Sequence, residues 1–118
     1  MRMSSLRVAL ILLLVSMVAG FGQEATKKAS RAEGESAVLT KVPPEYPSVA
    51  KQLKIQGTVE LQAVVGGTGE VEKVNIVSGN PVLTKPAMEA LKKWKFKPFL
   101  VDGKAATTEV PVVISFKL

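Results

Sequence analysis

Two blocks of the sequence alternate apolar and polar residues, and this alternation constrains the fold more than any other feature. In the first block, residues 58–65, the apolar residues on one side are Val59, Leu61, Ala63 and Val65. In the second block, the last nine residues, they are Val110, Val112, Ile114, Phe116 and Leu118. A period of two is typical of a β-strand with one face in the core and one face in water. We therefore expect both blocks to be strands of one half-buried sheet.

The residues after the first block predict a hairpin and a return strand. Gly66-Gly67-Thr68-Gly69 supplies the positive φ angles that a tight hairpin needs. Residues 70–78 form the expected return strand, and their apolar phase slips between Val71 and Val74. A β-bulge near Glu72-Lys73 would explain this slip.

Two stretches predict short helices. After Thr84, the expected N-cap, apolar residues recur at helical spacing, with Pro86 in the first turn. Val49 and Leu53 lie one helical turn apart, so residues 48–54 should lay an apolar stripe on the sheet. An Asp102-Gly103 turn leads into the last strand. The result is a small α+β module built around one short antiparallel sheet.

The composition excludes most catalytic chemistry. The chain has no Cys and no His, so it lacks a thiolate nucleophile, an imidazole base and the usual ligands of zinc, copper and haem. Its carboxylates are scattered along the sequence. The net charge of +6 favours acidic partners only weakly. In residues 93–99 lysines alternate with aromatic residues, but we expect the aromatic side chains to be buried and the lysines solvated, so no nucleic-acid partner is predicted. We expect a protein that is not an enzyme and has no cofactor.

The N-terminus has the pattern of a targeting segment. Arg2 and Arg7 come just before an apolar run over residues 8–19, and small residues follow the run. Residues 1–22 are therefore interpreted as a signal peptide or, alternatively, as a retained inner-membrane anchor. Residues 23–40 are rich in Ala, Lys, Glu and Ser without an apolar period, and they are interpreted as a flexible tether. Residues 41–118 form the predicted domain.

The last strand is the expected binding element. Pro111 has no backbone N–H, so its nitrogen should face an open edge or a bulge. The strand carries no charge between Val110 and Lys117, and an exposed edge of this kind is a hazard unless it is covered or used. An extended peptide from a partner could pair with it. Alternatively, the strand could pair with its own copy and form a homodimer.

An ordered set of motifs from about Pro44 to Leu118 resembles the TonB C-terminal domain family. The motifs are Tyr46-Pro47, Ile55-Gln56-Gly57, Gly69-Glu70-Val71, Val77-Ser78-Gly79, Ala87 with Leu91, Trp94-Lys95-Phe96 with Pro98, Asp102-Gly103 and the closing strand. The resemblance implies a three-stranded antiparallel sheet packed against two short helices. It also implies that the last strand pairs with the TonB box, a short extended peptide of TonB-dependent outer-membrane receptors, in the energy-coupled transport of nutrients.

The resemblance implies site residues, partners and a location. The implied peptide contacts are Val112, Val113, Ile114, Ser115 and Phe116 in the last strand, and Pro43, Pro44 and Glu45 before Tyr46. The implied location is the periplasm, or the inner membrane facing the periplasm. An ExbB/ExbD-type motor would be a further partner if the chain is anchored. The family usually has a motor-contacting His and a long spacer. This chain has neither, since a tether over residues 23–40 reaches at most roughly 65 Å. A free periplasmic adaptor, or a self-pairing module without energy transduction, therefore stays open as an alternative.

Overall fold

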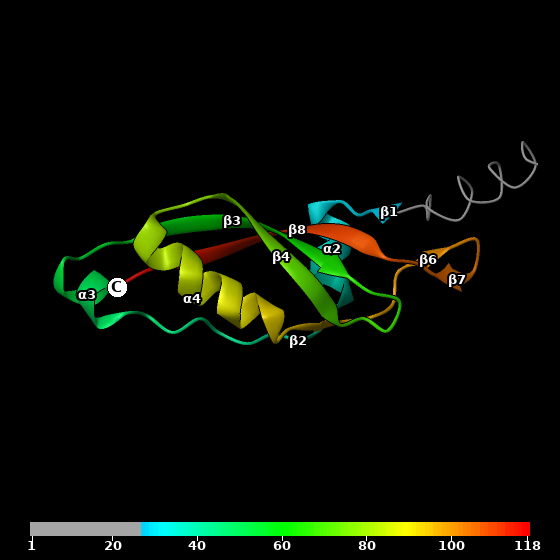
Figure 1. The fold of residues 1–118 in the computed structure, drawn as a ribbon, viewed down its shortest axis with the longest axis horizontal. Helices are drawn as coiled ribbons and strands as arrows, with labels where there is room; N and C mark the ends of the chain where they lie inside the picture. Colours follow the sequence, from blue (N-terminus) through cyan, green and yellow to red (C-terminus); the bar gives the residue numbers. More distant parts are fainter. Residues whose placement is uncertain (1–26) are drawn as a thin grey trace, which may run out of the picture.

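The computed structural model describes residues 27–118 and has the expected α+β architecture (Figure 1). The predicted leader and residues 23–26 lie outside the described residues. The main sheet has the order β1-β8-β3-β4. Its strands are β1 (Lys27–Lys28), β3 (Gly57–Val65), β4 (Val71–Ser78) and β8 (Thr108–Phe116). The three long strands are antiparallel to one another as predicted, and β1 adds a two-residue parallel strand beside β8.

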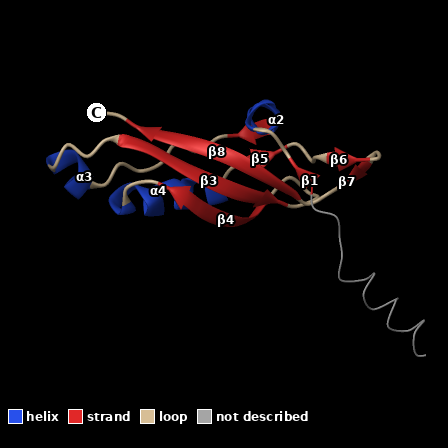
Figure 2. Cartoon of the chain, turned by 90° about the horizontal axis from the view of Figure 1, so that it is seen from above, coloured by secondary structure: helices blue, strands red, loops and turns tan. Residues whose placement is uncertain are grey.

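Within residues 27–118, three helices and two small two-stranded sheets complete the fold. The helices are α2 (Arg31–Ala37), α3 (Ser48–Gln52) and α4 (Pro81–Lys92). One small sheet joins β2 (Val38–Thr40) to β5 (Lys95–Phe96), and the other joins β6 (Leu100–Val101) to β7 (Lys104–Ala105). Figure 2 shows α4 beneath one face of the main sheet, α2 beside β8, and α3 at the end of the molecule.

The core lies between α4 and one face of the sheet, where the predicted alternation places it. The apolar residues of β3 and β8 listed above, except Leu118, are buried, as are Leu83, Ala87 and Leu91 of α4. The polar residues of both strands lie on the opposite face, where the Gln62 side chain donates a hydrogen bond of 3.2 Å to the Glu109 carboxylate. Trp94, Phe96 and Phe99 are also buried and the intervening lysines are exposed, as predicted.

The β3–β4 hairpin contains the predicted bulge. Val65 pairs with Val71 and Val64 pairs with Lys73, so Glu72 is the extra residue. The turn needs Gly69, which has a φ of +87°. A Cβ at this position would lie 1.9 Å from the Phe96 carbonyl oxygen, so the turn can approach β5 only because residue 69 has no side chain.

Helix α4 begins earlier than the sequence analysis predicted. Its N-cap is Asn80, whose side chain accepts a hydrogen bond of 3.0 Å from the Val82 N–H, and Pro81 occupies the first helical position. The prediction of Thr84 as N-cap was wrong. Pro86 therefore lies inside the helix rather than in its first turn.

The predicted apolar stripe of the short helix before β3 was also wrong. Val49 is 50% exposed and Leu53 is 66% exposed, and Ala50 is the buried residue of α3. The reason is the position of α3, which lies beyond the end of the sheet and so has no sheet surface beneath its apolar side chains (Figure 2). Tyr46 instead makes the contact with the core: its ring packs edge-on against Phe116, with 5.5 Å between centroids, and its hydroxyl donates to the Ile55 carbonyl.

Much of the predicted tether is folded. Residues 27–40 form β1, α2 and β2, where composition predicted no regular structure. Helix α2 has a capping box, in which the Ser30 side chain accepts from the Glu33 N–H at 3.1 Å and the Glu33 carboxylate accepts from the Ser30 N–H at 3.4 Å. The estimated reach of a flexible tether therefore does not apply to these residues.

Candidate functional site: the open edge of strand β8

The register of β8 decides which of its backbone groups are free to bind a partner. Its pairing with β3 runs without a break from Gly57 opposite Phe116 to Val65 opposite Thr108. On its other side, the carbonyls of Thr107 and Glu109 accept hydrogen bonds from Lys27 and Ala29. In an antiparallel pair the N–H and C=O of one residue point to the same side, and the side changes with each residue. Odd-numbered residues of β8 therefore direct their backbone groups away from β3.

This alternation leaves two residues with both backbone groups on the outer side of β8. Val113 and Ser115 direct an N–H and a C=O outward, beyond the part of the strand that β1 pairs with. Pro111 is in the same phase, so its missing N–H removes no bond to β3, as the sequence analysis expected. We refer to residues 112–116 as the open edge of β8.

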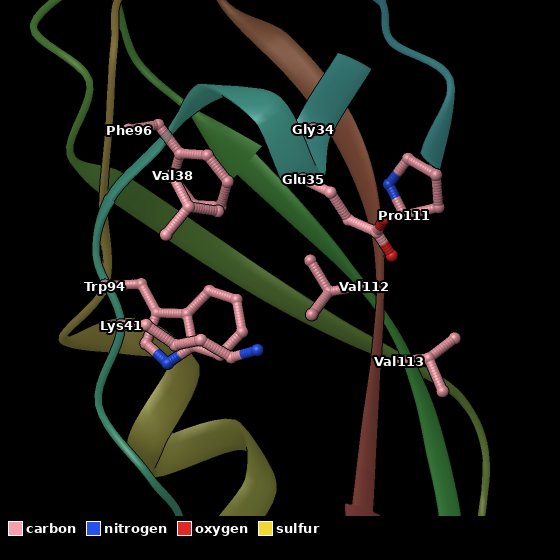
Figure 3. Close-up of a pocket in the computed structure, with 9 residues that line it drawn as sticks. All are labelled: Gly34, Glu35, Val38, Lys41, Trp94, Phe96, Pro111, Val112 and Val113. Atoms are coloured by element: carbon pink, nitrogen blue, oxygen red, sulfur yellow. The ribbon is translucent and has the colours of Figure 1, made fainter. Parts of the chain in front are cut away.

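A groove follows the open edge on the side of the sheet that faces α4. It consists of two adjoining cavities of about 270 and 460 Å³, which share Lys41, Trp94 and Val113. In the first cavity the Val112 side chain points inward from β8, while Pro111 and Val113 point away (Figure 3). We refer to the two cavities together as the edge groove.

The wall opposite β8 is an extended segment, residues 41–44, that the proline pair stiffens. The Trp94 indole N–H donates a hydrogen bond of 2.8 Å to the Val42 carbonyl and so fixes this segment to the end of α4. The Trp94 ring is only 5% exposed and forms part of the groove. The groove therefore has a rigid aromatic base between two extended backbones.

Two charged residues, Lys41 and Glu35, line the groove. The Lys41 ammonium lies 5.3 Å from the centre of the Trp94 ring, within the range of a cation–π contact. Glu35 lines the end of the groove at α2, where it pairs with Arg31 at 3.2 Å. The groove thus carries a positive group near its middle and a negative group at one end.

The structure brings together most of the residues that the resemblance implied. Pro43 and Pro44 line one cavity with Val113, Ile114 and Ser115. Val112 lines the other cavity, and Phe116 lies past the groove in a separate hollow of about 370 Å³ near Gln56. Glu45 is exposed and lines none of these cavities.

The register divides the predicted backbone contacts into two kinds. Val112, Ile114 and Phe116 direct their backbone groups to β3, so these groups are already in use within the sheet. Their contribution to the site is restricted to side chains. Among the predicted residues of β8, only Val113 and Ser115 direct backbone donors and acceptors outward.

The sequence analysis did not identify several residues of the groove. It assigned Gly34, Glu35 and Val38 to the tether, expected Trp94 and Phe96 only to be buried, and gave Lys41 and Val42 no role in the site. For α2 a signal was present, because Ser30 followed by Glu33 is a capping-box pattern. For Lys41 and Trp94 no local signal exists, since their meeting depends on a hydrogen bond across 52 residues of sequence.

The site has the chemistry of a binding surface. Within residues 27–118 no group of three or more His, Cys, Asp or Glu side chains is placed to hold a metal ion. In the same residues no helix has the length and apolarity needed to cross a membrane. What the groove offers is backbone hydrogen bonding along one side and apolar contact beneath.

Comparison with known proteins agrees with this architecture. Residues 42–118 match the family model described as Gram-negative bacterial TonB protein C-terminal. Protein TonB of Vibrio cholerae is 35% identical over 83 residues, which cover 69% of this chain and 34% of that protein. Protein TonB of Xanthomonas campestris pv. campestris is 38% identical over 78 residues, covering 64% of this chain and 35% of that protein. The chain thus spans about a third of the length of these relatives.

Two solved structures share the fold. The TonB2 protein of Vibrio anguillarum superposes with a TM-score of 0.52 at 35% identity, covering 82% of this chain and 84% of that one. The solution structure of the Pseudomonas aeruginosa TonB C-terminal domain superposes with a TM-score of 0.58 at 24% identity, covering 69% of this chain and 84% of that one.

Proposed function

The chain belongs to the TonB C-terminal family, and from this premise we propose that it is a non-enzymatic protein that binds an extended peptide at the open edge of β8. The peptide class is the TonB box of an outer-membrane receptor, which would add as one further strand. One observation carries the proposal: Val113 and Ser115 direct backbone donors and acceptors outward, directly beside an apolar groove. Main-chain bonds of this kind give strand addition its affinity, and the neighbouring pockets give it specificity.

The proposed cellular role follows from the same premise. The protein acts in the periplasm, in the energy-coupled transport of nutrients across the outer membrane. If its N-terminus is retained in the inner membrane, an ExbB/ExbD-type motor is its second partner. If the N-terminus is removed, the protein is a free adaptor for TonB boxes. Sequencing the N-terminus of the mature protein separates the two forms, because Phe21 or Gln23 as first residue indicates the free form.

The binding proposal is tested by titrating a fluorescently labelled TonB-box peptide of a receptor and recording its anisotropy. Ser115→Pro removes one outward N–H from an exposed position, and Pro111 shows that this phase of β8 accommodates proline. We expect Ser115→Pro to weaken binding about tenfold or more, because its partner carbonyl in the peptide loses its donor. The matched control, Ser115→Ala, keeps the N–H and should bind like the wild type.

Two results would contradict the proposal. The first is equal affinity of the folded Ser115→Pro variant and the wild type. The second is a stable homodimer, detected by light scattering at several protein concentrations, that saturating peptide does not dissociate. Such a dimer would indicate that the edge of β8 serves self-pairing. A dimer that the peptide dissociates would support the proposal, because self-pairing and peptide binding would then use the same edge of β8.

A further inference from the structure

The first half of the β8 edge is occupied by the residues that precede the domain. The N–H of Lys27 donates to the Thr107 carbonyl at 3.0 Å, and the N–H of Ala29 donates to the Glu109 carbonyl at 2.9 Å. Helix α2 follows at once and lies against the next residues of the strand (Figure 2). We refer to residues 27–36 as the N-terminal cover. It occupies the same side of β8 that Val113 and Ser115 leave open.

We propose that the N-terminal cover is displaceable and sets the length of the extended segment that β8 accepts. This inference rests on the proposed function, since it concerns regulation of the same edge. With the cover in place, a partner strand can pair along residues 112–116. With the cover released, the outward groups of Thr107, Glu109 and Pro111 become available, and the pairing surface extends over residues 107–116.

The contact between α2 and β8 depends on a close approach at one residue. Gly34 is the buried residue of α2, and it lies over Val110 and the carbonyl of Pro111. A Cβ at residue 34 would lie 2.4 Å from Cγ1 of Val110. Because Val110 is fully buried and β-branched, it has little freedom to move away. Any side chain at residue 34 should therefore lift α2 from the strand.

The cover is held by few interactions. Its buried residues are Ala29 and Gly34, which contribute almost no apolar side-chain area. The ion pair between Lys27 and Glu33, at 3.4 Å, is partly exposed and so adds little. Helix α2 has seven residues, too few to be stable without contacts to the rest of the protein. Segments with these properties open locally at low cost.

The residues that follow the cover are held more firmly, which places the hinge at the end of α2. The Ala37 carbonyl accepts a hydrogen bond of 2.7 Å from the Lys97 N–H, and Val38 pairs with Phe96 in the β2–β5 sheet. Both Ala37 and Val38 pack against the core. The cover can therefore leave β8 while residues 37–44 keep their place as the wall of the edge groove.

The inference is tested with two nested peptides, a five-residue TonB-box peptide and a ten-residue peptide that contains it, each with blocked ends and a fluorescent label. The five-residue peptide matches the open edge, and the ten-residue peptide matches residues 107–116. Gly34→Ala releases the cover. Ser36→Ala, at an exposed residue of the same helix, is the matched control.

A second variant holds the cover closed. Lys28 and Glu109 are directly paired between β1 and β8, so their Cα atoms lie within the range of a disulfide. The chain has no cysteine of its own, so the double variant Lys28→Cys, Glu109→Cys forms a single defined crosslink. The same protein is measured in its oxidised and reduced forms, which keeps the test valid if Gly34→Ala does not fold.

We expect the five-residue peptide to bind the wild type, Ser36→Ala and both redox forms of the crosslinked variant with equal affinity. Because Gly34 also lines one end of the edge groove, the affinity of the five-residue peptide for Gly34→Ala is the reference for the ten-residue peptide. The advantage of the ten-residue over the five-residue peptide should rise about fivefold or more from the wild type to Gly34→Ala, because release of the cover raises the fraction of competent protein. The ten-residue peptide should lose this advantage in the oxidised crosslinked protein and regain it on reduction. If both peptides bind every form with the same affinity, the cover is a permanent part of the fold and the inference is wrong, while the proposed function stands. If neither peptide binds any form, the proposed function fails and the inference fails with it.

Discussion

The indole N–H of Trp94 donates a hydrogen bond of 2.8 Å to the carbonyl of Val42, and this bond joins the end of helix α4 to the wall of the edge groove. It is the contact through which a core residue positions a surface segment. Lys41, which lies over the Trp94 ring, is placed by the same contact. The geometry of the groove therefore depends on one aromatic side chain.

Replacing Trp94 by Phe should destabilise the protein and weaken peptide binding together. The variant keeps an aromatic ring but leaves the Val42 carbonyl without its donor. We expect a loss of about 1–3 kcal/mol in the free energy of unfolding, measured by urea denaturation. Lys93→Ala, at an exposed neighbouring residue, should change the free energy by less than about 0.5 kcal/mol. An unchanged stability of the Trp94→Phe variant would show that the bond does not hold the wall.

Gly69→Ala should be strongly destabilising, and Gly67→Ala in the same hairpin should not. Gly69 combines a positive φ with a carbonyl 1.9 Å from the position of a Cβ, whereas a Cβ at Gly67 would have its nearest neighbour at an ordinary 3.6 Å. The positive φ alone costs a residue with a side chain about 1–3 kcal/mol. We expect Gly67→Ala to lie within about 1 kcal/mol of the wild type. Thermal unfolding of the two variants gives the comparison, and equal melting temperatures would be inconsistent with the turn described.

Burial predicts opposite outcomes for two leucines that both have helix-forming neighbours. Leu91 of α4 is fully buried, so Leu91→Ala should cost about 2–5 kcal/mol. Leu53 follows α3 and is 66% exposed, so Leu53→Ala should cost less than about 0.5 kcal/mol. Urea denaturation of both variants tests the position of α3 beyond the sheet. A large loss in the free energy of unfolding for Leu53→Ala would show that this side chain packs on the protein, as the sequence analysis predicted.

The capping box of α2 should respond to acid. The backbone hydrogen bond from Ser30, and then the hydrogen bond and charge of Lys27, lower the pKa of the Glu33 carboxyl. A carboxyl with a lowered pKa stabilises the folded form above its unfolded pKa, and this contribution is lost as the pH falls through its folded pKa. We therefore expect α2 to loosen on β8 in the acidic range, below the pH at which an ordinary glutamate titrates.

The amide signals of residues 29–36 in an NMR titration measure this loosening. In the wild type their hydrogen exchange should accelerate in acid beyond what intrinsic exchange rates account for. Glu33→Gln removes the titrating group, so its α2 amides should show no such step. A step of the same size in Glu33→Gln would assign the effect to another group.

The alternation of β3 and β8 and the slip within residues 70–78 were sufficient to predict the sheet, its buried face and the bulge at Glu72. These features depend on local side-chain periodicity, which the sequence displays directly. The family resemblance supplied the three long strands, and it did not predict the short strand β1. For residues 27–40 the composition predicted a flexible tether, and this prediction was wrong. The short helix α2 has small residues and no apolar stripe of its own, and its contact with β8 can stabilise it instead.

The site was less predictable than the fold. Periodicity identified β8 as the candidate edge, but the neighbours on each side decide which residues direct backbone groups outward. The hydrogen bonds from Lys27 and Ala29 to the carbonyls of Thr107 and Glu109 settle this phase, and they join distant parts of the sequence. Lys41 and Trp94 were missed for the same reason.

Hydrogen exchange at three neighbouring amides of β8 tests the central claim most directly. In the free protein the amides of Val113 and Ser115 should exchange rapidly, while the amide of Ile114, which faces β3, should be protected. Saturation with a TonB-box peptide should slow exchange at Val113 and Ser115 and leave Ile114 unchanged. If the peptide binds and the Val113 and Ser115 amides exchange as fast as before, then the peptide does not pair with the edge of β8.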